Sequence, residues 1–442
     1  MLLLGNGTLL TLGPAPRVIA GGALLMEGDT ITRVGETGEL KTAYPRARYI
    51  DCRGMLIMPG FTCAHAHTYG AFARGMALKG EPPDGFLQVL ERLWWRLDRS
   101  LTAEDIYHSA LVALIGHVKN GTTALLDHHA SPGAITGSLG HIARAARKIG
   151  LRVNLCYEVT DRDGEQKTAE GLEENAAFIT QCRQENSPLI TASLGMHASF
   201  TIGPKTMERC ARVAHDLGAG VHIHAAESRD DAADCREKYG LGVIERLARY
   251  GLLGEKTLVA HCVHIGEDEM DLLAASGTNV AHNPQSNMNN AVGCAPVRRM
   301  LDRGVLVGLG SDGMSGGMVA EMKAAHLLHR FAQGDTRAGW AEIPQMQFAN
   351  NARIMANFFP LRLGELAPGA AADVIVVDYD PPTPLTAENF YGHLLFGAAG
   401  QAVDTTVVAG KILMRHRVLT MVDEKETNAV ARELAAKLWE RI

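Results

Sequence analysis

The sequence predicts a (β/α)8 barrel of the TIM type with a small β-sandwich composed of both ends of the chain. Three observations lead to this α/β fold class. The 442 residues are 46% hydrophobic and 21% charged, which suits one large core with an accessory part. The middle of the chain alternates short apolar runs with helix-length stretches. Both ends carry short apolar runs broken by Gly, Pro and Asp instead.

Eight apolar runs in the middle of the chain are interpreted as the strands of the barrel. They lie near residues 59–67, 122–128, 151–157, 190–197, 220–225, 257–261, 278–282 and 305–312. The same alternation also fits a doubly wound open sheet, so the pattern alone does not separate the two folds. The stretches 101–119 and 172–183 have the length and spacing of ordinary outer helices.

The two ends of the chain have the pattern of a β-meander. Apolar runs occur at residues 2–4, 9–12, 23–26 and 31–34, and similar runs return at 373–378 and 405–414. We therefore expect residues 1–58 and 362–442 to form the composite β-sandwich, with the barrel between them at 59–361. The stretch 425–442 mixes apolar and charged residues and is expected to be an amphipathic helix of that outer part.

Charge and cysteine usage exclude several classes of function. The 43 Lys and Arg against 49 Asp and Glu form no basic block, so a nucleic-acid partner is not expected. No apolar run approaches the roughly 18–20 residues of a membrane span, and the N-terminus lacks the basic start of a signal peptide. The eight cysteines include no C-x-x-C pair, which indicates reduced thiols and a cytoplasmic location. The sequence leaves open whether the protein forms a homo-oligomer.

Histidines gather at the ends of the expected strands. In chain order they are His65, His67, His128, His129, His197, His222, His224, His261 and His282, and Asp312 ends the eighth run. A single histidine at a strand end is often only a hydrogen-bonded core residue. Because barrel enzymes build their sites at the C-terminal ends of the strands, the whole set predicts one shared site at the barrel mouth.

The spacing of these residues indicates metal chemistry. His65 and His67 lie two positions apart along a strand, so both imidazoles point to one face and make half of a tetrahedral divalent site. The segment His224-Ala-Ala-Glu227 adds an imidazole and a carboxylate, and Asp312 adds a hard oxygen ligand. A metal in such a site makes a water molecule nucleophilic at neutral pH. Glu227 is suited to move protons, and His261 to orient the water.

These motifs, taken in order, resemble the amidohydrolase superfamily in its branch of mononuclear deaminases and chlorohydrolases. The stretch 58–67 is similar to the opening motif of that branch, and 71–75 to its continuation. Further similar stretches are residues 196–201, 221–227, 259–261, 282–287, 308–313 and 369–376. Within the branch, one aminohydrolase subgroup is most similar at 94–99, 127–132, 160–162 and 286–290.

The resemblance implies a set of site residues. The implied ligands of one divalent metal, with Zn²⁺ favoured over Fe²⁺ or Mn²⁺, are His65, His67, His224 and Asp312. Glu227, His261 and Asp312 would move protons, and His197 would face the substrate. His197 ends the fourth run where binuclear hydantoinase-like members carry a lysine, which argues for a single metal. Cys63-Ala64 replaces the family's frequent Asn-Thr, so the identity of the substrate stays open.

The implied reaction is hydrolysis of an exocyclic C–N bond of a nitrogen-rich ring, with release of ammonia. Purines come first among the expected substrates, then pyrimidines and triazines. A halide or alkylamine leaving group needs the same residues, so a triazine-type chlorohydrolase or alkylaminohydrolase is the alternative. Residues 313–317 also match the G-x-S-x-G motif of serine hydrolases, with Asp378 and His393 downstream. That interpretation, like a non-catalytic barrel, leaves the histidine motifs without a purpose.

Four residues near the site have no settled role. Adjacent strand residues point to opposite faces, so only one of His128 and His129 is expected to reach the mouth. His222 is expected to support a ligand rather than to be one. Trp94 either caps the mouth and stacks on a flat ring or packs in the core.

Overall fold

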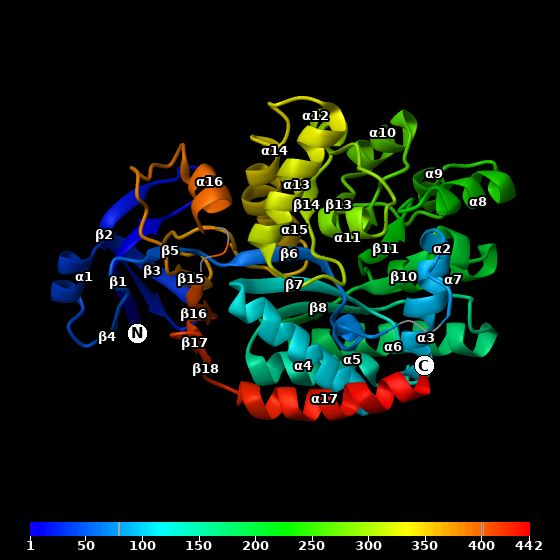
Figure 1. The fold of residues 1–442 in the computed structure, drawn as a ribbon, viewed down its shortest axis with the longest axis horizontal. Coiled ribbons are helices and arrows are strands. Elements are labelled where there is room, and N and C mark those ends of the chain that lie inside the picture. Colours follow the sequence, from blue (N-terminus) through cyan, green and yellow to red (C-terminus); the bar gives the residue numbers. More distant parts are fainter. Residues whose placement is uncertain (78–79, 399, 401) are drawn as a thin grey trace.

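The computed structural model describes residues 1–77, 80–398, 400 and 402–442. A barrel of parallel strands surrounded by helices lies beside a separate sheet, in which blue and orange-red strands from the two ends of the chain meet (Figure 1). The predicted fold class, a TIM barrel with a β-sandwich part, is therefore confirmed.

Eight parallel strands form the barrel, and each overlaps one of the predicted runs. They are β6 (Phe61–Ala66), β7 (Thr122–His129), β8 (Arg152–Tyr157), β10 (Leu194–Ala198), β11 (Val221–Ala225), β12 (Leu258–His261), β13 (Asn279–His282) and β14 (Val307–Leu309). Hydrogen bonding divides them into β6–β8 and β10–β14. Parallel bridges between Val159 and Met196 and between Ala66 and Asp312 join the two groups and close the ring.

The fourth predicted run differs from the structure because it is divided into two strands. Its first part, β9 (Ile190–Ala192), pairs with β8, whereas β10 pairs with β11. The change occurs at Ser193, whose N–H donates to Leu155 O, while the next N–H, of Leu194, donates to Gly220 O. The run is continuous in hydrophobicity, so its sequence carries no sign of this switch of partner.

Helices cover the outside of the barrel. They are α4 (Ala103–Lys119), α5 (Ser138–Ile149), α6 (Glu165–Glu185), α7 (Pro204–Asp216), α8 (Arg229–Tyr239), α9 (Val243–Arg249), α10 (Glu267–Ser276), α12 (Val297–Asp302), α13 (Met318–Gln333) and α15 (Asn351–Ala356). Helix α6 begins seven residues before the predicted start at 172. None of the helices in the described part of the chain has the length and hydropathy needed to cross a lipid bilayer.

Short helices fill the connections between these elements. They are η1 (Thr68–Ala73), α2 (Phe86–Val89), η2 (Leu90–Trp94), α3 (Trp95–Ser100), η3 (Ser199–Thr201), α11 (Pro284–Asn289), α14 (Glu342–Pro344) and η4 (Gln345–Asn350). Helices α2, η2 and α3 follow the first strand, and α11 follows the seventh. The catalytic face of a barrel lies at these C-terminal strand ends, so these four helices border the mouth.

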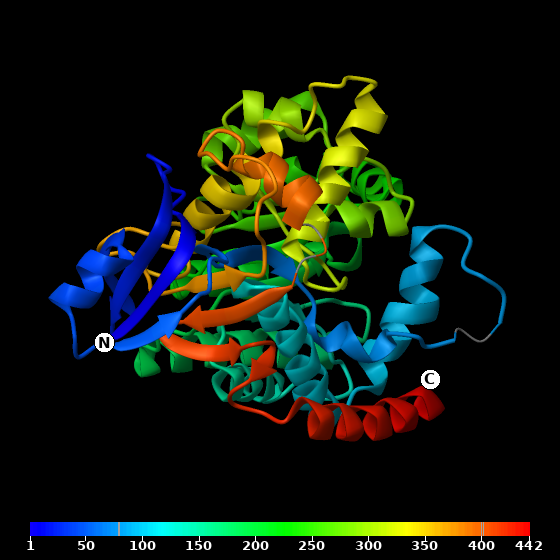
Figure 2. The ribbon, with the colours of Figure 1, turned by 60° about the vertical axis from the view of Figure 1, so that its left-hand side comes forward.

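One nine-stranded sheet unites the two ends of the chain, as the blue and red strands in Figure 2 show. Its strands are β1 (Leu2–Leu10), β2 (Val18–Glu27), β3 (Thr30–Glu36), β4 (Arg48–Asp51), β5 (Leu56–Pro59), β15 (Val374–Val377), β16 (Val403–Val408), β17 (Lys411–Arg415) and β18 (Val418–Leu419). Strand β5 from the first end pairs with β15 from the second. The division of the chain at residues 58 and 362 stays a prediction.

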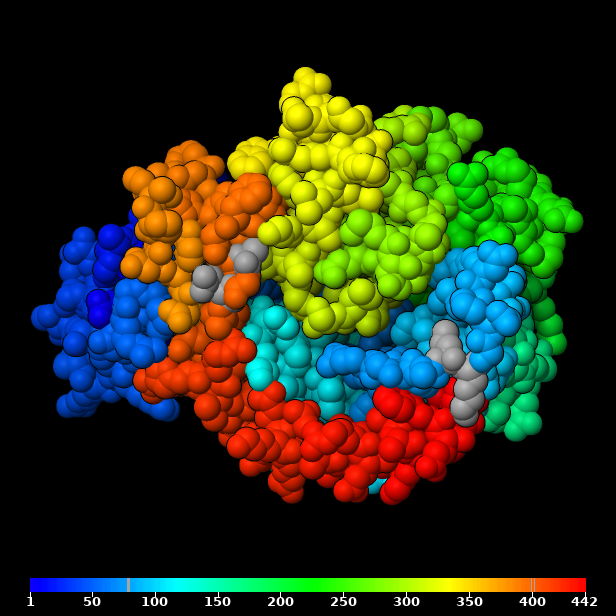
Figure 3. All heavy atoms as spheres, viewed as in Figure 1, coloured from blue at the N-terminus to red at the C-terminus, as the bar shows by residue number. Residues whose placement is uncertain are grey.

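The described parts of the two chain ends also contain helices. They are α1 (Thr37–Ala43), α16 (Phe390–Gly392) with the adjoining η5 (His393–Ala398), and α17 (Glu424–Arg441). Helix α17, red in Figure 3, runs along the barrel beside α4. Lys119 Nζ lies 2.6 Å from Glu424 Oε1, and Trp439 Nε1 donates to Phe72 O at 2.7 Å. The expected C-terminal helix therefore packs on the barrel.

A buried ion pair joins the barrel to the shared sheet. Arg152 of β8 contacts Asp373, directly before β15, through two hydrogen bonds of 2.8 and 3.0 Å. Arg152 also donates to Pro188 O, and Asp373 accepts the N–H of Ala409. Both charged side chains are buried, and these hydrogen bonds compensate for their removal from water.

Candidate active site

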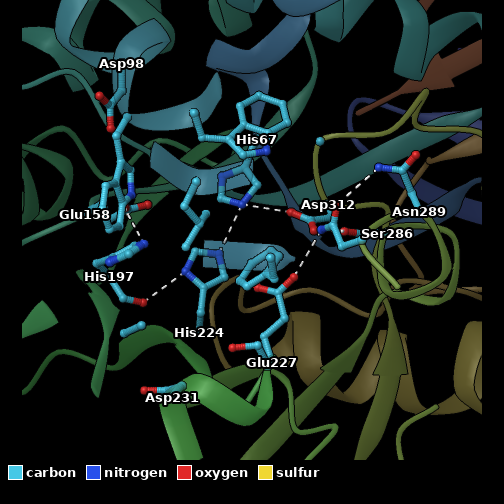
Figure 4. A pocket seen from close by; sticks show the side chains of 18 of the residues that line it. His67, Asp98, Glu158, His197, His224, Glu227, Asp231, Ser286, Asn289 and Asp312 are labelled. Carbon is cyan, nitrogen blue, oxygen red and sulfur yellow. Dashed lines mark hydrogen bonds and ion pairs between the residues drawn. The ribbon is translucent and has the colours of Figure 1, made fainter. Parts of the chain in front are cut away.

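Four predicted side chains converge at the mouth of the barrel. Ligand atoms of His65, His67, His224 and Asp312 all lie within 4.8 Å of one another. His67 Nε2 is 2.9 Å from Asp312 Oδ1 and 3.1 Å from His224 Nε2, and these contacts are drawn in Figure 4. His65 Nε2 lies 3.3 Å from the same Asp312 oxygen. The four residues come from the ends of β6, β11 and β14, which are far apart in the sequence.

The backbone at this mouth adopts conformations that L-residues rarely occupy. Asp312, His261 and Ala226 have φ angles of 53°, 75° and 47°. Left-handed non-glycine residues cost about 1–3 kcal/mol each and concentrate at functional sites. They occur directly where β14, β12 and β11 end, so the chain turns there and directs side chains into the mouth. Gly310 allows the close approach, because a Cβ there would lie 2.9 Å from His65 Cβ.

Hydrogen bonds to the second ring nitrogens orient the three imidazoles. His67 Nδ1 lies 2.6 Å from the carbonyl oxygen of His128, and His224 Nδ1 lies 3.0 Å from that of His197. A carbonyl only accepts, so each Nδ1 carries the proton and each Nε2 lone pair faces the mouth. His65 Nδ1 pairs with His222 Nε2 at 2.8 Å, which places His222 behind a candidate ligand, as predicted.

The donor set fits a divalent cation. Three imidazoles and one carboxylate are typical zinc ligands. His65 Nε2 is buried and has no hydrogen-bond partner in the described part of the structure. His67 Nε2 and His224 Nε2 face each other, an arrangement that a shared cation between the two lone pairs would stabilise. Burial lowers the pKa of His224 well below its ordinary value, which keeps this imidazole neutral and able to bind a metal.

Glu227 and His261 lie beside this set. His261 Nε2 is 3.5 Å from Glu227 Oε2 and 3.8 Å from Asp312 Oδ2. Burial, opposed by His261 and reinforced by Asp312, raises the pKa of the Glu227 carboxyl to about 7. A carboxyl group that titrates near neutral pH can both donate and accept a proton, as a general acid–base requires.

A second charged group forms the opposite wall and was missed from the sequence. Glu158 directly follows β8, and its carboxylate lies 3.2 Å from His128 Nδ1 and 3.5 Å from His197 Nε2. Although burial raises it, His197, His128 and Arg162 hold the pKa of Glu158 below its ordinary range. Its position at the end of a strand, like that of His129 and His197, was the available signal.

Arg162 and Asp98 extend this wall. Arg162 Nη2 lies 3.0 Å from Asp98 Oδ2 and 3.6 Å from Glu158 Oε1. Burial raises the pKa of Asp98 to about 6, although Arg162 lowers it. Asp98 Oδ1 and Arg162 Nη1 are buried without a partner in the part of the chain that the structure describes. Asp98 lies in the stretch 94–99, which resembles an aminohydrolase subgroup, but no role was predicted for this residue.

The pocket above these groups has an apolar side. Its lining residues on this side are Phe86, Leu90, Trp94, Trp95 and Met314, and His67, His224 and Asp312 line it as well. The pocket volume is about 820 Å³ including open solvent. Trp94 also packs against Gly70 and Gly313, where an added Cβ would lie 3.1 and 3.5 Å from its ring. Trp94 therefore combines both roles considered for it, lining the mouth and packing. Aromatic walls of this kind stack on flat rings.

The remaining predicted histidines have different surroundings. His197 lines the pocket, as expected for a residue facing the substrate. The buried His128 ring lies between the ligand histidines and Glu158, whereas His129 Nε2 lies 2.9 Å from Ser131 Oγ. His282 does not join the mouth: its Nε2 lies 3.1 Å from His329 Nε2 of α13. His282, the last residue of β13, therefore faces away from the site.

The serine-hydrolase alternative gains no geometric support. His393 Nδ1 lies 2.8 Å from the Tyr379 hydroxyl, and its Nε2 lies 3.2 Å from Pro384 O. Both ring nitrogens are thus engaged away from Ser315. The glycines around Ser315 instead serve close packing, since a Cβ at Gly316 would lie 2.6 Å from the His117 ring.

Comparison with known proteins places the chain in a family. Residues 56–413 match the amidohydrolase family, which spans most of the chain. The chain belongs to the amidohydrolase family. Residues 22–47 also match the imidazolonepropionase-like composite domain of bacteria. The resemblance inferred from the sequence motifs is thereby confirmed.

Curated relatives of this amidohydrolase are deaminases. A 5-methylthioadenosine/S-adenosylhomocysteine deaminase of Desulforudis audaxviator is 34% identical over 428 residues, covering 95% of this chain and 96% of its own. A 5'-deoxyadenosine deaminase of Methanosarcina mazei is 31% identical and covers 100% and 99%. The predicted class, a hydrolase acting on C–N bonds of cyclic amidines, is confirmed by these relatives.

A solved structure has the same fold along almost the whole chain. An adenosine deaminase of Xanthomonas campestris with bound zinc superposes with a TM-score of 0.88 at 23% identity, covering 99% of this chain and 98% of its own. At this identity the likeness establishes the fold.

Proposed function

We propose that this amidohydrolase is a zinc-dependent deaminase of adenosine-type nucleosides. The observation that carries the proposal is the position of Glu227 and His261 against Asp312, beside three inward-facing imidazoles at the floor of one pocket. Hydrolytic deamination needs these groups together: a site that activates water and a carboxyl group that moves a proton to the ring.

The proposed ligands are His65, His67, His224 and Asp312. A divalent ion bound there would lower the pKa of a coordinated water molecule and make it nucleophilic near neutral pH. The carbonyl oxygens of His128 and His197 hold the imidazoles of His67 and His224 with Nε2 directed inward. These two metal ligands are therefore oriented before an ion binds.

Proton transfer is assigned to the two carboxyl groups. Glu227 gives a proton to the ring nitrogen next to the carbon under attack, and Asp312 accepts the proton of the attacking water. A C–O bond forms at that carbon, and Asp312 passes the proton that it accepted to the exocyclic amino group. The exocyclic C–N bond then breaks and ammonia leaves, while the remaining hydroxyl proton returns to Glu227 as the ring carbonyl forms. His261, in contact with both carboxylates, orients the water between them.

The substrate class is supported by the relatives and by the pocket. Both curated relatives described above are named for deamination of adenosine derivatives. The apolar side of the pocket, with Trp94 and Phe86, suits a flat purine, and the polar side, with Glu158 and Asp98, can bind hydroxyl groups. Triazine hydrolases share the fold, so a chloro- or alkylaminotriazine remains the second candidate.

A substrate panel tests this proposal. Zinc-loaded protein is incubated with adenosine, 5'-deoxyadenosine, 5'-methylthioadenosine, S-adenosylhomocysteine, guanine, cytosine and an aminotriazine, and ammonia release is measured. We expect the highest kcat/KM on an adenosine derivative, and loss of the activity on chelation. A chlorotriazine and an alkylaminotriazine are assayed in parallel for release of chloride and alkylamine. Activity on these compounds alone would replace the proposal by its alternative.

The location and assembly of the protein are also proposals. All eight cysteines are free and seven of them are buried, which supports a reducing compartment such as the cytoplasm. A homo-oligomer stays a prediction, for which light scattering on the purified protein is the direct test.

A further inference from the structure

Helix α11 and the residue that directly follows it provide two asparagines, whose side chains contact the two residues assigned to proton transfer. Asn287 Oδ1 lies 2.8 Å from His261 Nδ1, and Asn290 Nδ2 donates to Glu227 Oε1 at 3.3 Å. The two asparagines are three residues apart, so they lie on one face at the end of this short helix.

The contact with Asn287 determines how the His261 ring is placed. Both side chains are completely buried, and the Asn287 carbonyl oxygen can only accept, so His261 Nδ1 carries the proton. The other nitrogen, Nε2, is thereby directed toward Glu227 and Asp312. His261 also has the left-handed φ of 75°, a conformation that persists only when the surroundings hold it.

The contact with Asn290 determines how the Glu227 carboxylate is turned. One oxygen, Oε1, accepts the Asn290 amide, which leaves Oε2 facing His261. The helix itself is anchored, because Pro284 starts it directly after β13 and the Gln285 N–H donates to the buried Glu321 at 3.3 Å. A single anchored element thus orients both groups relative to each other.

We propose that Asn287 and Asn290 form an asparagine clamp. This pair of positioning residues holds His261 and Glu227 in the relative orientation that proton transfer requires. The proposal rests on the function proposed above, because it assigns the clamp a role in that reaction. Neither asparagine needs to contact the reacting atoms. The clamp acts on turnover rather than on binding, since it sets the geometry of groups that act in the transition state.

Paired variants test the clamp. Asn287→Leu removes the acceptor for His261, and Asn287→Asp retains it. We expect Asn287→Leu to lower kcat by about 10–100-fold with KM nearly unchanged, and Asn287→Asp to recover most of that loss. Met288→Ala, on the exposed side of the same helix, is the matched control and should keep the wild-type kcat. Equal kcat in Asn287→Leu and wild type would overturn the proposal.

Two further measurements keep the test decisive. If Asn287→Leu does not fold, the half-exposed Asn290→Ala takes its place, with an expected loss in kcat of several-fold, and an unchanged kcat there overturns the clamp. A crystal structure of the zinc-loaded variant should show the His261 ring turned away from Glu227. That readout does not require turnover, so a wild-type protein inactive on every ring would contradict the proposed function and leave the clamp separately testable.

Discussion

Two buried arginine–carboxylate groups, one at each end of the barrel, are built in different ways. At the base, Arg152 and Asp373 satisfy each other with two hydrogen bonds and use their remaining atoms on backbone partners. At the mouth, Arg162 pairs with Asp98 and Glu158, but Arg162 Nη1 and Asp98 Oδ1 have no partner within the described residues. Buried polar groups are normally paired, so the unpaired Asp98 Oδ1 on the pocket wall is available to a ligand.

The same contrast extends to the surrounding residues. The sheet behind the base packs a wholly apolar cluster that includes Leu24, Ile31 and Val374. The mouth gathers imidazoles, carboxylates and left-handed residues such as Asp312. Stability and function are therefore placed at opposite ends of one barrel, as expected for this fold. Substitutions at the two ends should have separable effects.

The largest effect on kcat is expected for a substitution of Glu227, at the bottom of the barrel mouth. Glu227→Gln keeps the shape of the side chain but removes the proton that it carries. Because general acid–base catalysis contributes about 10²–10⁴-fold, we expect kcat to fall by that factor while zinc content and thermal stability stay near wild type. Steady-state kinetics with metal analysis check this. Turnover close to that of the unmutated chain would remove Glu227 from the mechanism.

The two arginines provide the direct comparison of the ends. Arg152→Met leaves Asp373 buried and unpaired, which should lower the free energy of unfolding by about 3–5 kcal/mol with little change in the kcat of the folded enzyme. Arg162→Met should instead lower kcat/KM, because Glu158 and Asp98 line the pocket. Its cost in unfolding free energy should be smaller than that of Arg152→Met, because His128 and His197 still contact Glu158. Denaturant unfolding and kinetics on both variants separate the two outcomes. The reverse pattern would contradict the division of roles.

The smallest effect concerns the pH dependence of stability. Asp231 accepts the N–H groups of Ala226 and Phe200, and burial raises the pKa of its carboxyl to about 7. The unfolded chain ionises this group near its ordinary value of 3.8, well before the folded chain does. Stability from this group is therefore present at low pH and is lost as pH rises toward 7.

Replacement of this aspartate should reduce that pH dependence. Asp231→Asn removes the titrating group, so we expect a smaller fall in unfolding free energy between about pH 4 and pH 7 than in the wild type. Thermal or denaturant unfolding across this interval measures the slope. An identical slope in the two proteins would show that the Asp231 carboxyl does not titrate in this range.

Much of the architecture was predictable because its signals are local. Apolar runs marked all eight barrel strands, and H-x-H and H-x-x-E spacings marked the residues that meet at the mouth. The switch of partner at Ser193 and the surroundings of His282 depend on three-dimensional register, which the runs do not encode.

The roles of the supporting residues were not assigned from the sequence, although some of them lie in stretches that resemble relatives. Glu158, Asp98, Arg162 and Asn287 are of types that also occur in loops and on helix surfaces. Only the fold shows that they face one pocket or one catalytic side chain. Spacing identifies a metal-ligand pair on one strand, but it cannot identify a partner that arrives from another strand.

Zinc stoichiometry tests the central claim most directly. Wild-type protein and His224→Ala are stripped with a chelator, reloaded with zinc, desalted and measured by mass spectrometry for metal per chain. The account predicts one zinc per wild-type chain, with deaminase activity restored on reloading, and a large loss of bound zinc in His224→Ala. A variant that retains one zinc per chain would contradict the assignment of the site at the barrel mouth.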